Sequence, residues 1–279
     1  MLLLTNLGFC KNAHFTGFIP PVKDAIFPIN DHHRKNKKMA IKGLLFDKDG
    51  TLLDFNKSWV PVNRIAAMTM AQNDGDLADV LLNKTGQTGN SVAANSILAM
   101  GNTHEIVSAW LDILPGQHNL NKAVVLIDGI FQTEGAKSAV PLPDMTTTIQ
   151  NLHSSGYKMG LATSDSHQGA LKSLSTFDVI DYFHFISGYD SGHGHKPGPG
   201  MVHGFCQALQ LRPQEIAVIG DNAHDLDMGQ NAGVGLCIGV LSGTGNRDTL
   251  STADHIIESI SELPTLLSKF EISSTTTPV

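Results

Sequence analysis

Short apolar runs of strand length alternate with amphipathic stretches along the second half of the chain. The runs cover residues 157–164, 183–186, 216–219 and 236–240, and apolar residues recur at helical spacing between them. Near-continuous apolar strands separated by helices are typical of a parallel sheet that is covered on both faces. The pattern therefore predicts an α/β fold with a doubly wound parallel sheet. We expect Asp144 to cap the helix before the run at 157.

The segment between the first predicted strand and these runs has helical spacing. Within it, Asn102 and Glu105 are spaced as a capping box in front of an apolar stripe. We therefore predict an all-helical insert, a cap domain over residues 57–140. The α/β core would then consist of residues 39–56 and 141–271.

The first 38 residues differ from the rest of the chain. Residues 1–9 are apolar but too short to span a bilayer and lack a basic leader, and residues 31–38 are polar and cationic. Met39 stands immediately before the first predicted strand. We predict a poorly ordered N-terminal extension over residues 1–38, or an upstream start, with organelle targeting as the weaker alternative. Residues 272–279 are predicted to form a frayed polar tail.

Composition narrows the classes of partner. The chain has 19 basic and 26 acidic residues and a net charge of −7, which argues against nucleic acid and anionic membranes. Its three cysteines, Cys10, Cys206 and Cys237, are odd in number and widely spaced, which fits neither a disulfide framework nor a zinc site. A reducing, cytoplasmic compartment fits best, and the chain is expected to be a monomer or a homodimer.

Four polar clusters lie at or just beyond the ends of predicted strands. They are Asp47, Asp49 and Thr51; Thr163 and Ser164; Lys196; and Asp221, Asn222 and Asp225. Since catalytic groups of an open α/β sheet gather beyond the carboxyl ends of its strands, we expect these clusters to form one site. For the first cluster taken alone, a solvated acidic loop is the alternative.

The residue types in these clusters suit phosphoryl transfer. A phosphate ester repels an incoming anion, so a carboxylate nucleophile such as Asp47 needs a cation beside it. Asp47 and Asp221 can provide that cation site, and their hard oxygen ligands favour Mg²⁺. Asp47 would then form an aspartyl-phosphate, while Asp49, two residues further along an exposed turn, acts as acid and base.

Other polar residues have both a functional and a structural interpretation. The Thr163 hydroxyl and the Ser164 amide can bind phosphate oxygens at a helix start, whereas Ser164 can equally cap that helix. Lys196 can neutralise charge on the phosphoryl group and the nucleophile, or it can be a solvated surface charge. Asp225 can reach the metal because it lies four residues after Asp221.

In order and context, the four clusters resemble the signature motifs of the haloacid dehalogenase (HAD) superfamily, over about residues 41–269. The surrounding sequence is similar to phosphoglycolate phosphatase-like members, which have a helical C1-type cap inserted in a Rossmann-like core. The resemblance implies that the Asp49 backbone carbonyl is a metal ligand and that its carboxylate marks phosphoryl transfer from oxygen. It also favours the catalytic role of Lys196. Asn222 departs from the serine or threonine that relatives often carry.

Supporting roles follow for residues beside the catalytic clusters and in the cap. Thr51 is expected to brace the acidic turn, and Asn222 to hydrogen-bond behind the metal ligands. In the cap, the candidates for binding a carboxylate or hydroxyl of the substrate are Asn56, Lys57, Trp59, Arg64 and the turn at residues 84–86, with Arg64 making a bidentate contact. Each can instead be a solvated residue of its helix.

The favoured function is a Mg²⁺-dependent phosphatase of a small phosphorylated metabolite, with 2-phosphoglycolate the leading substrate by resemblance. A sugar-phosphate mutase, which returns the phosphoryl group to its substrate, is the alternative. A non-catalytic binding or regulatory module ranks last because every expected catalytic position is filled. A zinc site at His193, His195 and His224 is disfavoured because these residues lack a closed ligand set.

Overall fold

The computed structural model describes residues 40–116 and 118–271. The predicted N-terminal extension, residues 1–38, and the predicted tail, residues 272–279, lie outside this part of the chain. Within it, no helix combines the length and the apolar character needed to cross a membrane.

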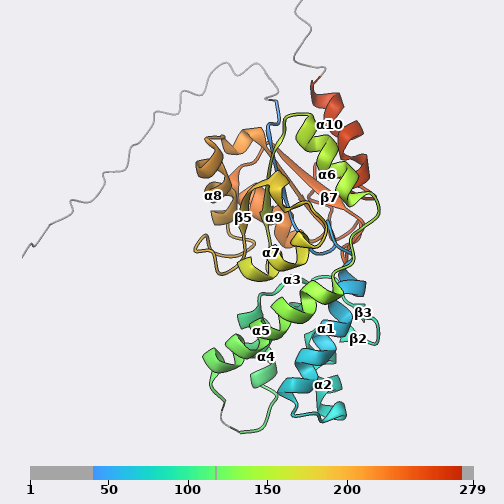
Figure 1. Ribbon diagram of the computed structural model, residues 1–279, viewed down its shortest axis with the longest axis vertical. Coiled ribbons are helices and arrows are strands. Elements are labelled where there is room, and N and C mark those ends of the chain that lie inside the picture. The colour runs from blue at the N-terminus through green and yellow to red at the C-terminus, as the bar shows by residue number, and fades with distance from the viewer. Residues whose placement is uncertain (1–39, 117, 272–279) are drawn as a thin grey trace, which may run out of the picture. The chain divides into compact units, whose positions relative to one another are not determined.

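The centre of the fold is a parallel sheet of six strands in the order β5-β4-β1-β6-β7-β8 (Figure 1). The strands are β1 (Gly43–Phe46), β4 (Lys158–Ala162), β5 (Phe183–Ser187), β6 (Ile216–Gly220), β7 (Leu236–Val240) and β8 (His255–Ile257). The order places β4 and β6 on either side of β1. The structure confirms the predicted α/β fold, and the last strand, β8, was not predicted.

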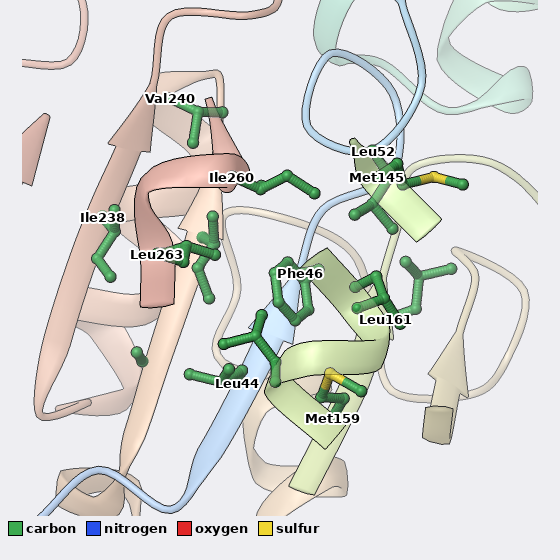
Figure 2. Packing of buried hydrophobic residues seen from close by; sticks show 14 of the residues in the cluster. Leu44, Phe46, Leu52, Met145, Met159, Leu161, Ile238, Val240, Ile260 and Leu263 are labelled. Carbon is green, nitrogen blue, oxygen red and sulfur yellow. The ribbon is translucent and has the colours of Figure 1, made fainter. Parts of the chain in front are cut away.

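Helices cover both faces of this sheet. Successive residues of β1 point to opposite faces, so they belong to different hydrophobic clusters. Leu44 and Phe46 belong to a cluster with α6 (Met145–Ser154), α7 (His167–Ser175) and α10 (Leu263–Glu271). Leu45 belongs to a second cluster with α8 (Gly200–Leu209) and α9 (Ala223–Ala232). Figure 2 shows Leu44 and Phe46 packed among the residues of the first cluster.

The insert between β1 and β4 has a hydrophobic core of its own. It contains α1 (Phe55–Met70), α2 (Gly75–Thr85), α3 (Ile97–Met100), α4 (Thr103–Leu111) and α5 (Leu120–Ser138). It also contains an antiparallel hairpin of β2 (Gln87–Thr88) and β3 (Ser91–Val92). The insert is therefore not entirely helical. Strands of two residues are too short to produce an alternating pattern, so only the Gly89-Asn90 turn between them marks the hairpin in the sequence.

Two predicted helix caps have different outcomes. The capping box of α4 is confirmed, since the Glu105 amide donates to Asn102 Oδ1 at 3.1 Å and the Asn102 amide to Glu105 Oε2 at 2.9 Å. The prediction for Asp144 was wrong. It precedes α6, but its φ is 61° and its side chain accepts no capping hydrogen bond. The left-handed backbone at this residue is the geometry that differs from an ordinary N-cap, which lies in the extended region.

Candidate active site

Three adjacent strands deliver polar residues to the same edge of the sheet. Asp47 follows β1, Thr163 follows β4 and Asp221 follows β6, and the registers pair Phe46 with both Leu161 and Ile219. Carboxylate oxygens of Asp47, Asp221 and Asp225 all lie within 4.8 Å of one another. Strand ends far apart in sequence therefore meet around one small volume.

The acidic turn after β1 was predicted to be exposed, but it is packed against Asp221 and largely buried. Asp47 is only 8% exposed. Gly50 has a φ of +91°, and a Cβ atom there would lie 2.5 Å from Asp221 Oδ2. The Gly50 carbonyl accepts a hydrogen bond of 2.7 Å from Ser242 Oγ, in the loop after β7. Glycine is required here both for its left-handed backbone and for the close approach of a carboxylate.

Lys196 links two of these carboxylates. Its Nζ lies 2.5 Å from Asp47 Oδ1 and 2.5 Å from Asp225 Oδ1, and its side chain is fully buried. Burial alone would lower the pKa of Lys196, but the charges of Asp225 and Asp47 outweigh it and raise the pKa. The ammonium therefore stays charged beside the nucleophile proposed from the sequence, and it is not a solvated surface group.

Two of these carboxyl groups, Asp47 and Asp221, have raised pKa values. Burial, together with the charges of Asp225 and Asp49, raises the pKa of Asp47 to about 6 although Lys196 opposes the shift. Burial and the charges of Asp47 and Asp225 raise the pKa of Asp221 well above its ordinary value. Buried carboxylates that repel one another, with hard oxygen donors, suit a divalent cation such as Mg²⁺. The residues present therefore fit the metal that the sequence predicts.

Asp221 and Asp225 are both fixed by hydrogen bonds. Asp221 Oδ2 accepts from Asn222 Nδ2 at 2.9 Å and from the Thr244 amide at 2.8 Å. Asp225 Oδ2 accepts from the Asn222 amide at 3.1 Å, at the start of α9. Asn222 therefore hydrogen-bonds to both Asp221 and Asp225. Thr244 was missed because it lies in a loop more than twenty residues further along the chain, with only a run of small residues to mark it.

Thr163 and Ser164 both line a pocket at the strand ends, and Asp47, Asp49 and Asp221 line the same pocket. Thr163 is 1% exposed, and its Oγ1 accepts a hydrogen bond of 3.1 Å from the Asp165 amide. Ser166, and not Ser164, caps α7 by accepting from the Gly169 amide at 3.1 Å. The Ser164 hydroxyl instead donates to the Met100 carbonyl of the insert at 2.9 Å. Helix capping therefore does not account for Ser164.

Lys48, between the two motif aspartates, is a buried charge that the sequence analysis overlooked. Its Nζ lies 2.8 Å from Asp49 Oδ2 and 3.2 Å from Asp165 Oδ2, and its side chain is 1% exposed. It also lies 5.3 Å from the centre of the Trp59 ring in α1. Burial works against its charge, but Asp49 and Asp165 raise the pKa of Lys48 overall. Lys48 therefore connects the acidic turn to the loop after β4 and to the insert.

We expect Lys48→Met to destabilise the protein by about 3 to 5 kcal/mol, because it leaves a buried carboxylate without its cation. Burial already raises the pKa of Asp165 from 3.8, and Lys48 opposes that rise. Losing Lys48 raises the folded-state pKa of Asp165 further above its value in the unfolded chain. The unfolded state then gives up this proton at a lower pH than the folded state does, so the variant loses stability as the pH increases. The loss measured by urea unfolding should therefore be larger at pH 8 than at pH 5.

Lys137→Met is the matched control for that measurement. Lys137 is 65% exposed and pairs with Glu134 on α5, so its loss should change the unfolding free energy by less than about 0.5 kcal/mol. Equal losses for the two variants, or a Lys48→Met loss that does not depend on pH, would contradict the buried ion pairs.

Of the cap residues predicted to contact substrate, Trp59 lines the pocket, but Lys57 and Arg64 lie elsewhere. The Lys57 side chain is 70% exposed and pairs with Asp54 at 2.8 Å. Arg64 pairs with Asp79 in a separate hollow on the insert. Neither is brought to the pocket that holds Asp47. The insert residues that do line it are mostly apolar and include Phe55 and Trp59.

Thr51 and His224 can also be located. Thr51 is fully buried in the turn, and its Oγ1 has no hydrogen-bond partner within the described residues. His224 lines the pocket with its Nε2 3.7 Å from Asp225 Oδ1, and burial lowers its pKa to about 3. In residues 40–116 and 118–271, the one group of side chains that could hold a metal is the acidic one, without His193, His195 or His224.

Comparison with known proteins identifies relatives of this chain. A phosphoglycolate phosphatase of Vibrio vulnificus is 27% identical over 228 residues, which are 81% of this chain and 96% of that protein. The pyrophosphatase PpaX of Halalkalibacterium halodurans is 32% identical over a shorter stretch of 98 residues, 35% of this chain and 46% of that protein.

Solved structures share the fold. The crystal structure of a predicted phosphatase from Clostridium acetobutylicum has a TM-score of 0.63 and 18% identity, and the match covers 83% of this chain and 100% of that one. A hydrolase from Pseudomonas syringae has a TM-score of 0.62 and 17% identity, covering 82% and 98%. The model of the haloacid dehalogenase-like hydrolases matches residues 41–233. The chain therefore belongs to the haloacid dehalogenase-like hydrolase family.

Proposed function

We propose that this protein is a Mg²⁺-dependent phosphatase that hydrolyses a small phosphorylated metabolite through an aspartyl-phosphate on Asp47. The observation that carries the proposal is the position of the Asp47 carboxylate. It lies at a strand tip, 2.5 Å from the Lys196 ammonium and within 4.8 Å of oxygens from two further carboxylates. With a divalent cation bound among these carboxylates and Lys196 beside it, an anionic nucleophile could approach an anionic phosphate.

The reaction has two steps. A carboxylate oxygen of Asp47 attacks phosphorus, the ester P–O bond breaks, and the Asp49 carboxyl gives its proton to the leaving alkoxide. A water molecule then attacks phosphorus and gives a proton to Asp49, the Asp47–phosphorus bond breaks, and inorganic phosphate leaves. The Thr163 hydroxyl and the Ser164 amide bind phosphate oxygens, and Lys196 neutralises the charge that gathers on the phosphoryl group and Asp47.

Asp47, Asp221 and the backbone carbonyl of Asp49 would hold the Mg²⁺ ion. When bound, the ion neutralises negative charge on both the nucleophile and the phosphate. Asp225 supports this set by holding Lys196, and Asn222 supports it by holding Asp221.

2-Phosphoglycolate is the reference substrate. The sequence resemblance favours it, and the relative from Vibrio vulnificus carries it in its name. Another relative is named a pyrophosphatase, so family membership alone does not identify the leaving group that this chain releases.

The test is phosphate release from a panel of phosphorylated metabolites, with and without Mg²⁺. We expect EDTA to abolish turnover and added Mg²⁺ to restore it, because the buried acidic cluster then regains its counter-ion. Full activity in EDTA would refute metal dependence. Product analysis separates the mutase alternative, which yields an isomerised sugar phosphate in place of free phosphate.

A further inference from the structure

The wall of the active-site pocket that faces the catalytic aspartates comes from the insert, and it is mostly apolar. Phe55, Trp59, Leu98, Ile106 and Phe131 line the pocket from four different helices. Trp59 and Phe131 meet edge to face, with ring centres 5.2 Å apart. This wall is where the part of a substrate beyond its phosphate would lie.

The polar residues on this wall are neutral. Asn63 is 2% exposed, and its Nδ2 donates to Gln87 Oε1 of the hairpin at 3.0 Å. Thr103 is 3% exposed and adds a single hydroxyl. The wall therefore offers a few hydrogen-bonding atoms but no charge.

Cations near this wall are committed elsewhere. In residues 40–116 and 118–271, no lysine or arginine of the insert lines the pocket. Lys48 lies 5.3 Å from the centre of the Trp59 ring and pairs with both Asp49 and Asp165. Lys196 lies between Asp47 and Asp225 and pairs with both. None of these groups is available to pair with a carboxylate on the leaving group.

These features discriminate between substrates of equal size. A carboxylate transferred from water to an apolar wall loses its hydration and gains no partner, which is costly. A branched alkyl or aromatic group at the same position gains from burial against Trp59, Ile106 and Phe131. We propose, on the basis of the phosphatase function above, that the alcohol half of the substrate is uncharged and apolar where it meets the insert.

The decisive experiment compares two nearly isosteric phosphate esters with the wild-type protein and Mg²⁺. In 2-methylpropyl phosphate, two methyl groups replace the carboxylate oxygens of 2-phosphoglycolate. We expect kcat/KM, measured by phosphate release, to be at least about tenfold higher for 2-methylpropyl phosphate.

The two possible failures are distinguishable. Equal or faster hydrolysis of 2-phosphoglycolate overturns this inference and leaves the phosphatase function intact. No phosphate release from these esters or from the wider panel overturns the phosphatase function, and this inference with it.

A pair of variants tests the contact itself. Ile106→Arg places a cation on the apolar wall and should shift the ratio of kcat/KM values at least about tenfold towards 2-phosphoglycolate. Val125→Arg adds the same charge at a residue that is 73% exposed on α5, and it should leave the ratio unchanged. An equal shift in both variants would count against the inference. If Ile106→Arg does not fold, the wild-type comparison still decides.

Discussion

Asp47→Asn should lower kcat by about 10⁴-fold or more, the scale on which loss of a catalytic nucleophile acts. The amide is a poor nucleophile, and it also removes one charge from the proposed metal site. The fold should survive, because asparagine has nearly the same shape and Lys196 keeps its contact with Asp225. Steady-state phosphate release on the best substrate of the panel measures the effect.

Acid quenching after brief mixing with radiolabelled substrate shows whether the loss concerns a covalent step. If the label is in the phosphoryl group, the quenched wild-type protein should retain it and Asp47→Asn should retain none. Thermal unfolding of both proteins is the control for folding. Turnover of Asp47→Asn within about tenfold of the wild type would reject covalent catalysis at this residue.

Lys196→Met should lower kcat/KM by about 10²- to 10³-fold, corresponding to roughly 3 to 4 kcal/mol of lost electrostatic stabilisation in the transition state. The substitution keeps a long apolar stem but removes the cation that lies 2.5 Å from both Asp47 and Asp225. The effect should persist at saturating Mg²⁺, because the lysine charge acts on the phosphoryl group as well as on Asp47.

The matched control is again Lys137→Met, which removes an exposed lysine outside the pocket. It should change kcat/KM by less than about twofold. If kcat/KM of Lys196→Met falls by less than tenfold while the control behaves as expected, Lys196 is a structural ion-pair partner and does not stabilise the transition state.

The meeting of the strand ends was predictable because each polar cluster follows an apolar run. Parallel strands bring their carboxyl ends to one edge, so Asp47, Thr163 and Asp221 could be grouped without knowledge of the loops. The capping box at Asn102 was equally predictable, because its hydrogen bonds join residues only three positions apart.

Features that depend on distant parts of the chain could not be predicted in this way. Lys48 stands between two aspartates, where a lysine is usually solvated, and its burial needs both Asp165 and the Trp59 ring. The sites of Lys57 and Arg64 depend on the rotation of α1 about its axis. Spacing identifies helical faces but does not say which face meets the pocket.

Gly50 determines how closely the acidic turn and Asp221 approach each other. Since even a methyl group at this residue would overlap the Asp221 carboxylate, the gap is defined by a hydrogen atom and a left-handed backbone. A substitution that changes only the charge of Asp47 or Asp221 would leave that gap as it is. The spacing between the acidic turn and Asp221 would thus be encoded in main-chain geometry, separately from the charges of the acids.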